Sequence, residues 1–141
     1  MYPSLKVMSD TDIVALLRSH GIHPTSQRVL IARVLFTRCT HLSAEDVFRL
    51  VNTENRRVSK ATVYNTLGLF ADKGVVRAVI ADPDRIFYDP NTDPHHHFFD
   101  VATGELTDIS AEQIHVSGLP PLPNGAKLEG VDVIVRLRAA K

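Results

Sequence analysis

The period of the hydrophobic pattern changes once along the chain, directly after residue 74, and this change limits which folds are available. Before it, Val63, Leu67 and Phe70 recur at the spacing of one helical face. The following residues predict a strand, a turn and a returning strand, over 75–80, 81–84 and 85–88. A helix followed by a small hairpin is typical of a winged helix-turn-helix.

Further helices are expected upstream, because residue types that cap helix N-termini precede each apolar stretch. Residues 43–46 resemble a capping box, with Asp in place of the usual Glu. Gly21 is expected to end the first helix. We expect helices to begin after Ser9, after Pro24-Thr25, after Ser43 and after Ser59, the last ending at Lys73-Gly74.

Residues 89–94 are rich in turn-forming types and predict a hinge between two domains, residues 1–88 and 95–141. In the second domain we expect strands over 95–101, 105–109 and 131–137, a short helix over 110–116 and a Pro/Gly-rich loop over 118–130. The expected fold class is α+β: an N-terminal winged helix-turn-helix domain, then a small α/β domain. Domains of about 50 residues bury little surface alone. We therefore expect a homodimer, with higher oligomers left open, formed through this second domain.

The charges are divided unevenly along a chain whose net charge is zero. Residues 1–80 contain 11 Lys and Arg against 6 Asp and Glu, whereas residues 81–141 contain 5 against 10. A basic half suits contact with phosphates, and an acidic half attracts cations. The two halves are thus predicted to have different roles.

No apolar run approaches the roughly 20 residues of a membrane span, and the start lacks the pattern of a secretory signal. We expect a cytoplasmic protein with no membrane partner. The single cysteine, Cys39, cannot form an internal disulfide or a four-thiolate zinc site.

The polar face of the helix after Ser59 offers groups that suit DNA. Lys60 suits a phosphate. Asn65 can make two hydrogen bonds to adenine, and the Tyr64 ring can meet a thymine methyl group. Further candidates lie before this helix and at the start of the second one. The full set for contact with double-stranded DNA is Gln27, Arg28, Arg56, Arg57, Lys60, Thr62, Tyr64 and Asn65.

Three consecutive histidines, residues 95–97, follow the hinge. On a strand, His95 and His97 point to one side and His96 to the other. Two imidazoles can share a metal ion such as zinc, iron or manganese. Further candidate ligands are His41, Asp89 and Asp108. A site built from these residues would bridge the domains, so that metal fixes their angle and the spacing of the DNA-reading helices in a dimer.

Four motifs, in order, resemble the Fur family of metal-responsive DNA-binding regulators, and the resemblance extends over about residues 11–138. They are Thr25-Ser26-Gln27-Arg28, His41 to Phe48, Ala61 to Leu67, and His95 to Phe98. The resemblance implies a regulator rather than an enzyme, and it places Tyr64 at a base-contacting position. It also places His41, His95, His97 and Asp108 at the family's inter-domain metal site. Either Tyr88 or Asp89 is the fifth ligand, and Asp89 is the better ligand for a hard cation.

This chain departs from the family pattern at two places. Asn65 stands where many members have arginine, so the operator sequence is left open. Many members have a Cys-x-x-Cys zinc motif after the histidines, whereas this chain has Asp100-Val101-Ala102-Thr103. The resemblance therefore implies no structural four-cysteine zinc.

The triple histidine and residues 98–106 are most similar to the Irr branch, the iron response regulators. That similarity implies Fe²⁺ or Mn²⁺ as the divalent metal, with Zn²⁺ also binding in vitro. It further implies haem at His95, His96 and His97, since Cys39 is not followed by the proline of a Cys-Pro haem motif. The expected function is a repressor or activator of iron-homeostasis genes that binds palindromic operators as a dimer.

Two other classes of function are alternatives. A small histidine-site metalloenzyme, or a metal or haem storage protein without DNA binding, would also use the histidines. Both leave the basic half and the reading helix without a role. The physiological ligand, and whether it strengthens or weakens DNA binding, stay open.

Overall fold

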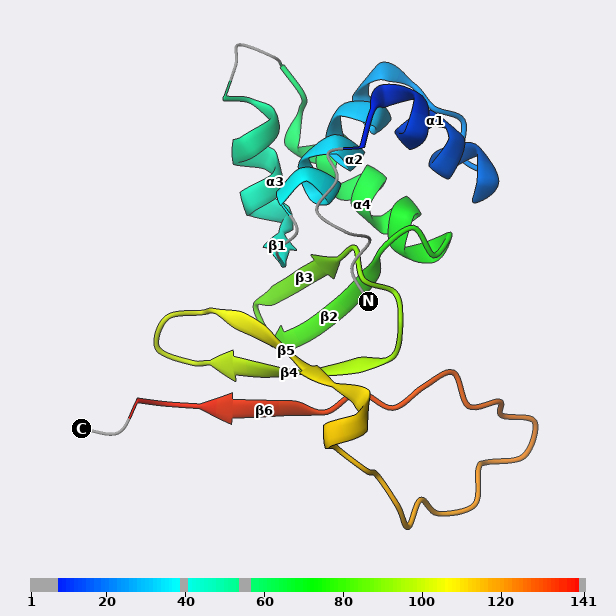
Figure 1. The fold of residues 1–141 in the computed structure, drawn as a ribbon, viewed down its shortest axis with the longest axis vertical. Coiled ribbons are helices and arrows are strands. Elements are labelled where there is room, and N and C mark those ends of the chain that lie inside the picture. Colours follow the sequence, from blue (N-terminus) through cyan, green and yellow to red (C-terminus); the bar gives the residue numbers. More distant parts are fainter. Residues whose placement is uncertain (1–7, 39–40, 54–56, 140–141) are drawn as a thin grey trace. The chain divides into compact units, whose positions relative to one another are not determined.

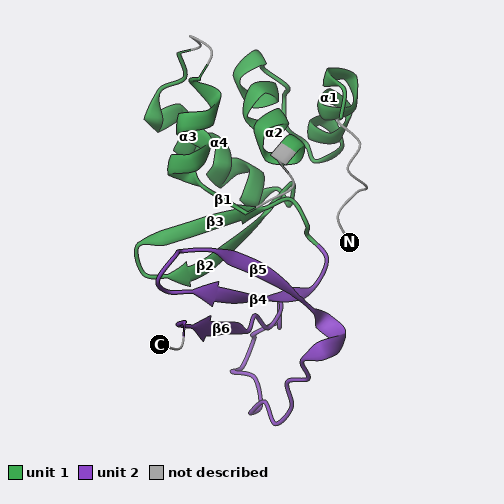
Figure 2. Ribbon diagram, turned by 60° about the vertical axis from the view of Figure 1, so that its left-hand side comes forward, with its two compact units in different colours: residues 1–92 green, residues 93–141 purple. Residues whose placement is uncertain are grey.

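The computed structural model describes residues 8–38, 41–53 and 57–139. The chain forms two compact units, residues 1–92 and 93–141 (Figure 2). Cys39 and Arg56, both considered above, lie outside the described residues. None of the described helices is long and apolar enough to span a bilayer.

Within the described ranges, the first unit contains four α-helices and a three-stranded antiparallel sheet of order β1-β3-β2 (Figure 1). The helices are α1 (Asp10–Ser19), α2 (Ser26–Arg38), α3 (Ala44–Val51) and α4 (Lys60–Asp72), and the strands are β1 (Leu42–Ser43), β2 (Arg77–Asp82) and β3 (Arg85–Asp89). This is the predicted winged helix-turn-helix, with the β2–β3 hairpin as the wing.

Side-chain caps begin the helices where the sequence predicted them. The Ser43 hydroxyl accepts the Asp46 amide at 3.2 Å, and the Asp46 carboxylate accepts the Ser43 amide at 3.1 Å. The predicted capping box with Asp is thus confirmed, and Ser9 forms a second one with Asp12. Such caps satisfy amides that have no partner inside the helix, typically contributing about 1 kcal/mol each.

The apolar faces of the helices meet in one core. Val63, Leu67 and Phe70 of α4, which the sequence placed on one face, are all 0% exposed. They pack with fully buried side chains of the other helices, including Ile13, Leu17, Ile31, Leu35 and Val47. This packing holds α4 by one face, so that its opposite face is left for other contacts.

The wing begins two residues later than predicted. Because the amides of Val75 and Val76 donate to the Phe70 carbonyl at 2.9 and 3.4 Å, they close the end of α4 instead of entering a strand. Both side chains are buried in the core. Gly74 permits this path with a φ of 78°. The predicted turn was also too wide, since residues 81 and 82 extend β2.

Strand β1 was not predicted. Its two residues pair with β3 in the register Leu42 to Tyr88 and Ser43 to Phe87. A two-residue strand has no periodicity to detect. Its pairing tethers the chain just after His41 to the wing strand that ends at Asp89.

The second unit is built on a three-stranded sheet of order β5-β4-β6. Its strands are β4 (His95–Asp100), β5 (Leu106–Ser110) and β6 (Ile134–Leu137). Strand β4 is antiparallel to β5 and parallel to β6. Gly104, with a φ of 76°, lies in the connection between β4 and β5.

Two predicted elements of the second unit are shorter in the structure. The helix expected over 110–116 is only a single 3₁₀ turn, η1 (Ala111–Gln113), because Ile114 returns to extended backbone. The strand expected from residue 131 begins at Ile134. Before it, the Val133 amide donates to the His96 ring at 3.0 Å rather than to a neighbouring strand.

Candidate metal-ligating groups and nucleic-acid interface

Helix α4 presents a polar face opposite its buried one. Lys60, Tyr64 and Asn65 are exposed, and Thr62 is half-buried. Ser59 caps the helix by accepting the Thr62 amide at 3.1 Å. The helix therefore offers its polar side chains to solvent from its first two turns, the part that reads bases in a helix-turn-helix.

A groove of about 260 Å³ joins this face to the start of α2. Gln27 and Arg28 line one side, and Thr62 and Asn65 line the other. The Arg28 guanidinium donates to the His23 carbonyl at 2.9 Å, which orients it at the helix start. The structure thus brings together four of the candidates that the sequence selected from two separate helices.

The other DNA candidates are placed differently. Arg57 is exposed in the segment before α4 and does not line this groove. The Lys60 ammonium lies 3.7 Å from the Glu45 carboxylate and 5.8 Å from the centre of the Tyr64 ring. Glu45 was not predicted as a member of this face, because an exposed acidic residue in the first turn of a helix is commonly explained by its interaction with the helix dipole.

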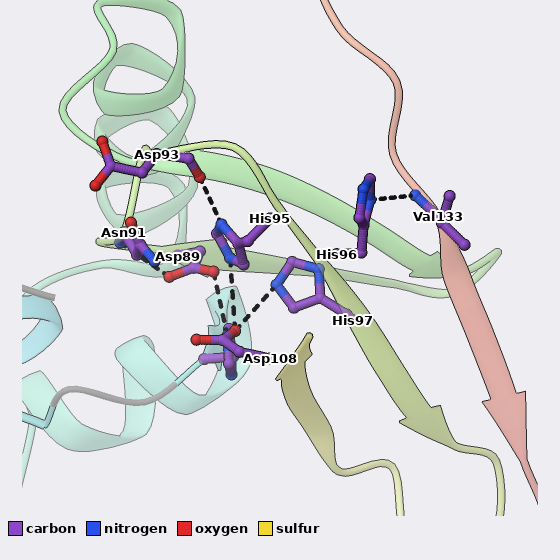
Figure 3. A network of polar contacts seen from close by, with 9 residues as sticks. Asp89, Asn91, Asp93, His95, His96, His97, Asp108 and Val133 are labelled. Atoms are coloured by element: carbon purple, nitrogen blue, oxygen red, sulfur yellow. Dashed lines mark hydrogen bonds and ion pairs between the residues drawn. The ribbon is translucent and has the colours of Figure 1, made fainter. Parts of the chain in front are cut away.

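The first unit contains one pair of candidate metal ligands. His41 Nε2 lies 3.1 Å from Asp89 Oδ2, and both side chains are buried. Asp89 is oriented by its other oxygen, which accepts the Asn91 amide at 2.9 Å (Figure 3). Tyr88, the alternative to Asp89, precedes it on β3, so its side chain projects to the opposite face of the sheet.

The second unit contains a group of three candidate ligands. His95 and His97 lie on one face of β4, and Asp108 of β5 pairs in register with His97. Asp108 Oδ1 lies 3.5 Å from His95 Nε2 and 3.4 Å from His97 Nε2 (Figure 3). The three residues offer ligand atoms within 4.8 Å of one another. An ion among these atoms would draw them to bonding distance with only small movements.

The donor chemistry of this group fits a divalent metal. His95 Nδ1 lies 2.6 Å from the Asp93 carbonyl, which can only accept a hydrogen bond (Figure 3). The proton is therefore on Nδ1, and the lone pair is on Nε2, the atom that faces Asp108. Such a carbonyl contact is the usual way in which proteins orient a metal-binding histidine.

His96 differs from its neighbours. Its Nδ1 accepts the Val133 amide at 3.0 Å, on the β6 side of β4 (Figure 3). This nitrogen must be unprotonated to accept, so the neutral ring holds its proton on Nε2. His96 thus links β4 to the residue just before β6, and it is not part of the group with Asp108.

Asp100 occupies the position where the resemblance led us to look for a thiolate. Its carboxylate accepts the Ala102 and Thr103 amides at 2.8 and 3.1 Å, and these bonds lower the pKa of Asp100. The carboxylate thus shapes the β4–β5 turn. With a single cysteine in the whole chain, the protein lacks the thiolates of a four-cysteine zinc site.

Strong chelation is expected to leave the folded protein intact. A structural zinc typically contributes about 10–16 kcal/mol of binding free energy to folding, whereas this turn is closed by hydrogen bonds. The untagged protein treated with EDTA should keep its melting profile nearly unchanged. Circular dichroism melts and metal analysis are the measurements. A stoichiometric zinc whose removal unfolds the protein would contradict this prediction.

Comparisons with known proteins agree with this geometry. Residues 19–134 match the ferric uptake regulator family. The peroxide-responsive repressor PerR of Staphylococcus aureus (strain Mu50) is 31% identical over 102 residues, which cover 72% of this chain and 69% of the repressor. This relative is a repressor rather than an enzyme, and it is not an Irr protein.

Solved structures show the same fold. The ferric uptake regulator of Vibrio cholerae has a TM-score of 0.71 at 21% identity, over 91% of this chain and 100% of its own. That of Pseudomonas aeruginosa, with manganese, has a TM-score of 0.70 at 24% identity, over 95% of this chain and 100% of its own. The family match alone spans most of the sequence. The chain therefore belongs to the ferric uptake regulator family of transcriptional regulators.

Proposed function

We propose that this protein is a DNA-binding transcriptional regulator that binds a palindromic operator as a homodimer and controls iron-homeostasis genes. The observation that carries the proposal is the groove shared by α2 and α4, in which Gln27 and Arg28 face Thr62 and Asn65. Amide, guanidinium and hydroxyl groups are the donors that position a protein on phosphates and read base edges. Such a regulator acts where the DNA is, in the cytoplasm.

The signal proposed is a divalent metal ion. The first unit supplies two ligands, His41 and Asp89, and the second supplies His95, His97 and Asp108. Neither group alone fills the four to six positions that such an ion prefers, so we propose that one ion takes ligands from both. Imidazole with carboxylate suits Fe²⁺ and Mn²⁺. The P. aeruginosa relative was solved with manganese and that of Francisella tularensis with iron.

Metal would act on DNA binding through the hinge at residues 89–94. An ion held by both groups favours one angle between the domains and so one spacing of the two α4 helices in the dimer. Asp89 is the fifth ligand in this proposal rather than Tyr88, because Asp89 already contacts His41.

We propose haem as a second ligand, because the triple histidine and residues 98–106 are most similar to the Irr branch. Its iron would be held by an imidazole of residues 95–97. At His96 the available atom is Nε2, since Nδ1 already accepts the Val133 amide. Haem taking His95 or His97 would withdraw ligands from the divalent ion, so the two ligands would act in opposition.

The experiment that tests the function is DNA binding by the purified protein, measured without metal, with Mn²⁺ and with haem. Gel shifts against genomic fragments should select palindromic sites, and the affinity should change on adding either ligand. A protein that binds Mn²⁺ or haem but no DNA would overturn the proposal and favour an enzyme or a storage protein.

Alanine variants of Tyr64 and Lys60 should weaken DNA binding in different ways. Lys60→Ala should weaken binding to all sequences and lower the salt dependence by about one phosphate contact. Tyr64→Ala should cost about 1–3 kcal/mol on the operator and little on random DNA, because an exposed ring on the reading helix contacts bases. Fluorescence anisotropy at several salt concentrations measures both. Equal losses on operator and random DNA would remove Tyr64 from base reading.

A further inference from the structure

The first turn of α3 places a carboxylate on the proposed DNA-binding face. Glu45 Oε1 lies 3.7 Å from the ammonium of Lys60, the first residue of α4. The Glu45 side chain is 75% exposed and that of Lys60 is 61% exposed, and both line a hollow of about 370 Å³. The ammonium also lies 5.8 Å from the centre of the Tyr64 ring, one turn further along α4. A carboxylate, an ammonium and an aromatic ring are thus in contact in series within the first unit.

Helix α3 is capped without the help of Glu45. The neighbouring Asp46 completes the capping box with Ser43, and it also pairs with Arg49 at 3.5 Å. Asp46 further supplies the negative charge that the positive end of a helix dipole favours. An exposed ion pair such as that of Glu45 with Lys60 adds little to the stability of the fold, because water screens both charges. We therefore look for the effect of Glu45 in what Lys60 binds.

A negative charge is unfavourable at this place if the face meets DNA. Lys60 is proposed to contact a phosphate, and a phosphate oxygen would approach the same ammonium that Glu45 faces. Lys60 then exchanges one anion for another, so it gains less than a lysine without a partner would. The carboxylate also stays within the ~10 Å over which charges act on one another at 0.1 M salt, and it repels the phosphate. Both effects lower the affinity for DNA of any sequence.

We infer that Glu45 is a positioning residue that limits the affinity of this protein for double-stranded DNA, because it competes with phosphate for the Lys60 ammonium. In the DNA-free protein, Glu45 holds the ammonium beside the Tyr64 ring, whose face attracts a cation. On DNA, a phosphate displaces Glu45 from the ammonium. A protein whose phosphate contacts are weakened in this way depends more on its contacts with bases to stay bound. This role of Glu45 rests on the proposed function.

Anisotropy titrations test this role with two probes, a random-sequence duplex and a genomic site selected by gel shift. Glu45→Gln keeps the shape of the side chain and removes its charge. The variant should bind both probes about two- to fivefold more tightly than the parent does. The gain in affinity should shrink as salt is added, because screening weakens both the ion pair and the repulsion. A change in packing alone would not depend on salt in this way.

A double-mutant cycle shows whether Glu45 acts through Lys60. In a Lys60→Ala background, Glu45→Gln should change the affinity much less, since no ammonium is left for the carboxylate and the phosphate to share. The matched control is Asp72→Asn, which removes one negative charge from the exposed last residue of α4, ~18 Å along the helix from Lys60. Because this distance exceeds the screening length, the control should bind DNA as the parent does. Circular dichroism checks that every variant is folded.

Three results would overturn the role of Glu45 in a protein that binds DNA. Glu45→Gln that binds no more tightly than the control would show that the carboxylate does not compete with phosphate. Weaker binding of the genomic site alone would place Glu45 on a base, such as the amino group of a cytosine. An equal gain with and without Lys60 would mean that Glu45 does not act through Lys60. A parent protein that binds neither probe would overturn the proposed function itself, and the role of Glu45 with it.

Discussion

Changing His95 and His97 together to alanine is expected to abolish the response of operator affinity to Mn²⁺. The pair supplies two of the three ligands proposed in the second unit, and Asp108 alone cannot hold an ion there. A coupling of about 1–3 kcal/mol is ordinary for such regulation, so the parent's affinity should change roughly 5–150-fold with metal and the variant's not at all. The response of operator affinity to haem should disappear in the same double variant. Anisotropy titrations of the operator, with and without each ligand, measure these effects.

Two further variants make this test specific. His115→Ala removes an exposed histidine of the same unit, outside the ligand group, and should respond to metal as the parent does. His41→Ala should weaken the response to Mn²⁺ and leave most of the haem absorbance band, because His41 belongs to the other unit. Since His95 and His97 are both buried, circular dichroism and size-exclusion chromatography must show a folded dimer. A double variant that still responds to Mn²⁺ as the parent does would refute the assignment of these ligands.

Truncating Phe70 should have the largest effect on stability. Its side chain is 0% exposed in the core of the first unit, and its carbonyl accepts the two amides that close α4. Phe70→Ala removes a buried ring and leaves a cavity, which typically costs about 3–5 kcal/mol. Because natural domains are stable by only about 5–15 kcal/mol, this variant should be partly unfolded near 37 °C and weak in DNA binding.

Urea denaturation followed by circular dichroism measures this loss. The matched control is Leu69→Ala, the neighbouring residue of α4, which is only partly buried and should cost clearly less. The midpoint of the Phe70→Ala transition should fall while its slope stays similar. A loss below about 1 kcal/mol would mean that the core around α4 can collapse into the space, contrary to the dense packing of the helices.

Local features of this fold could be predicted from the sequence because their causes are local. Ser9, Ser43 and Ser59 begin helices through bonds to residues only three positions away. The buried face of α4 follows from the spacing of Val63, Leu67 and Phe70, since helical geometry alone places them on one side. In the same way, strand alternation predicted that His95 and His97 share a face and that His96 lies opposite.

Features that depend on contacts between distant residues were missed or misplaced. Strand β1 exists only because β3 pairs with it, and β6 begins late because His96 takes the Val133 amide. The end of α4 takes Val75 and Val76 out of the wing, although their β-branched side chains suit a strand equally well. In each case a hydrogen bond to a particular partner decided the backbone conformation, because the local preference of the residues for strand structure is weak.

The sequence by itself determined which residue types were available for chemistry, and the tertiary structure decided which of them lie close together. The choice between Tyr88 and Asp89 could not be made from composition, because a shift of one residue on a strand reverses the face. The pairing of β1 with β3 accompanies the contact of Asp89 with His41 and leaves Tyr88 on the opposite face of β3. The contact between His41 and Asp89 had no signature in the sequence, since the two residues lie far apart along the chain and only folding brings them together.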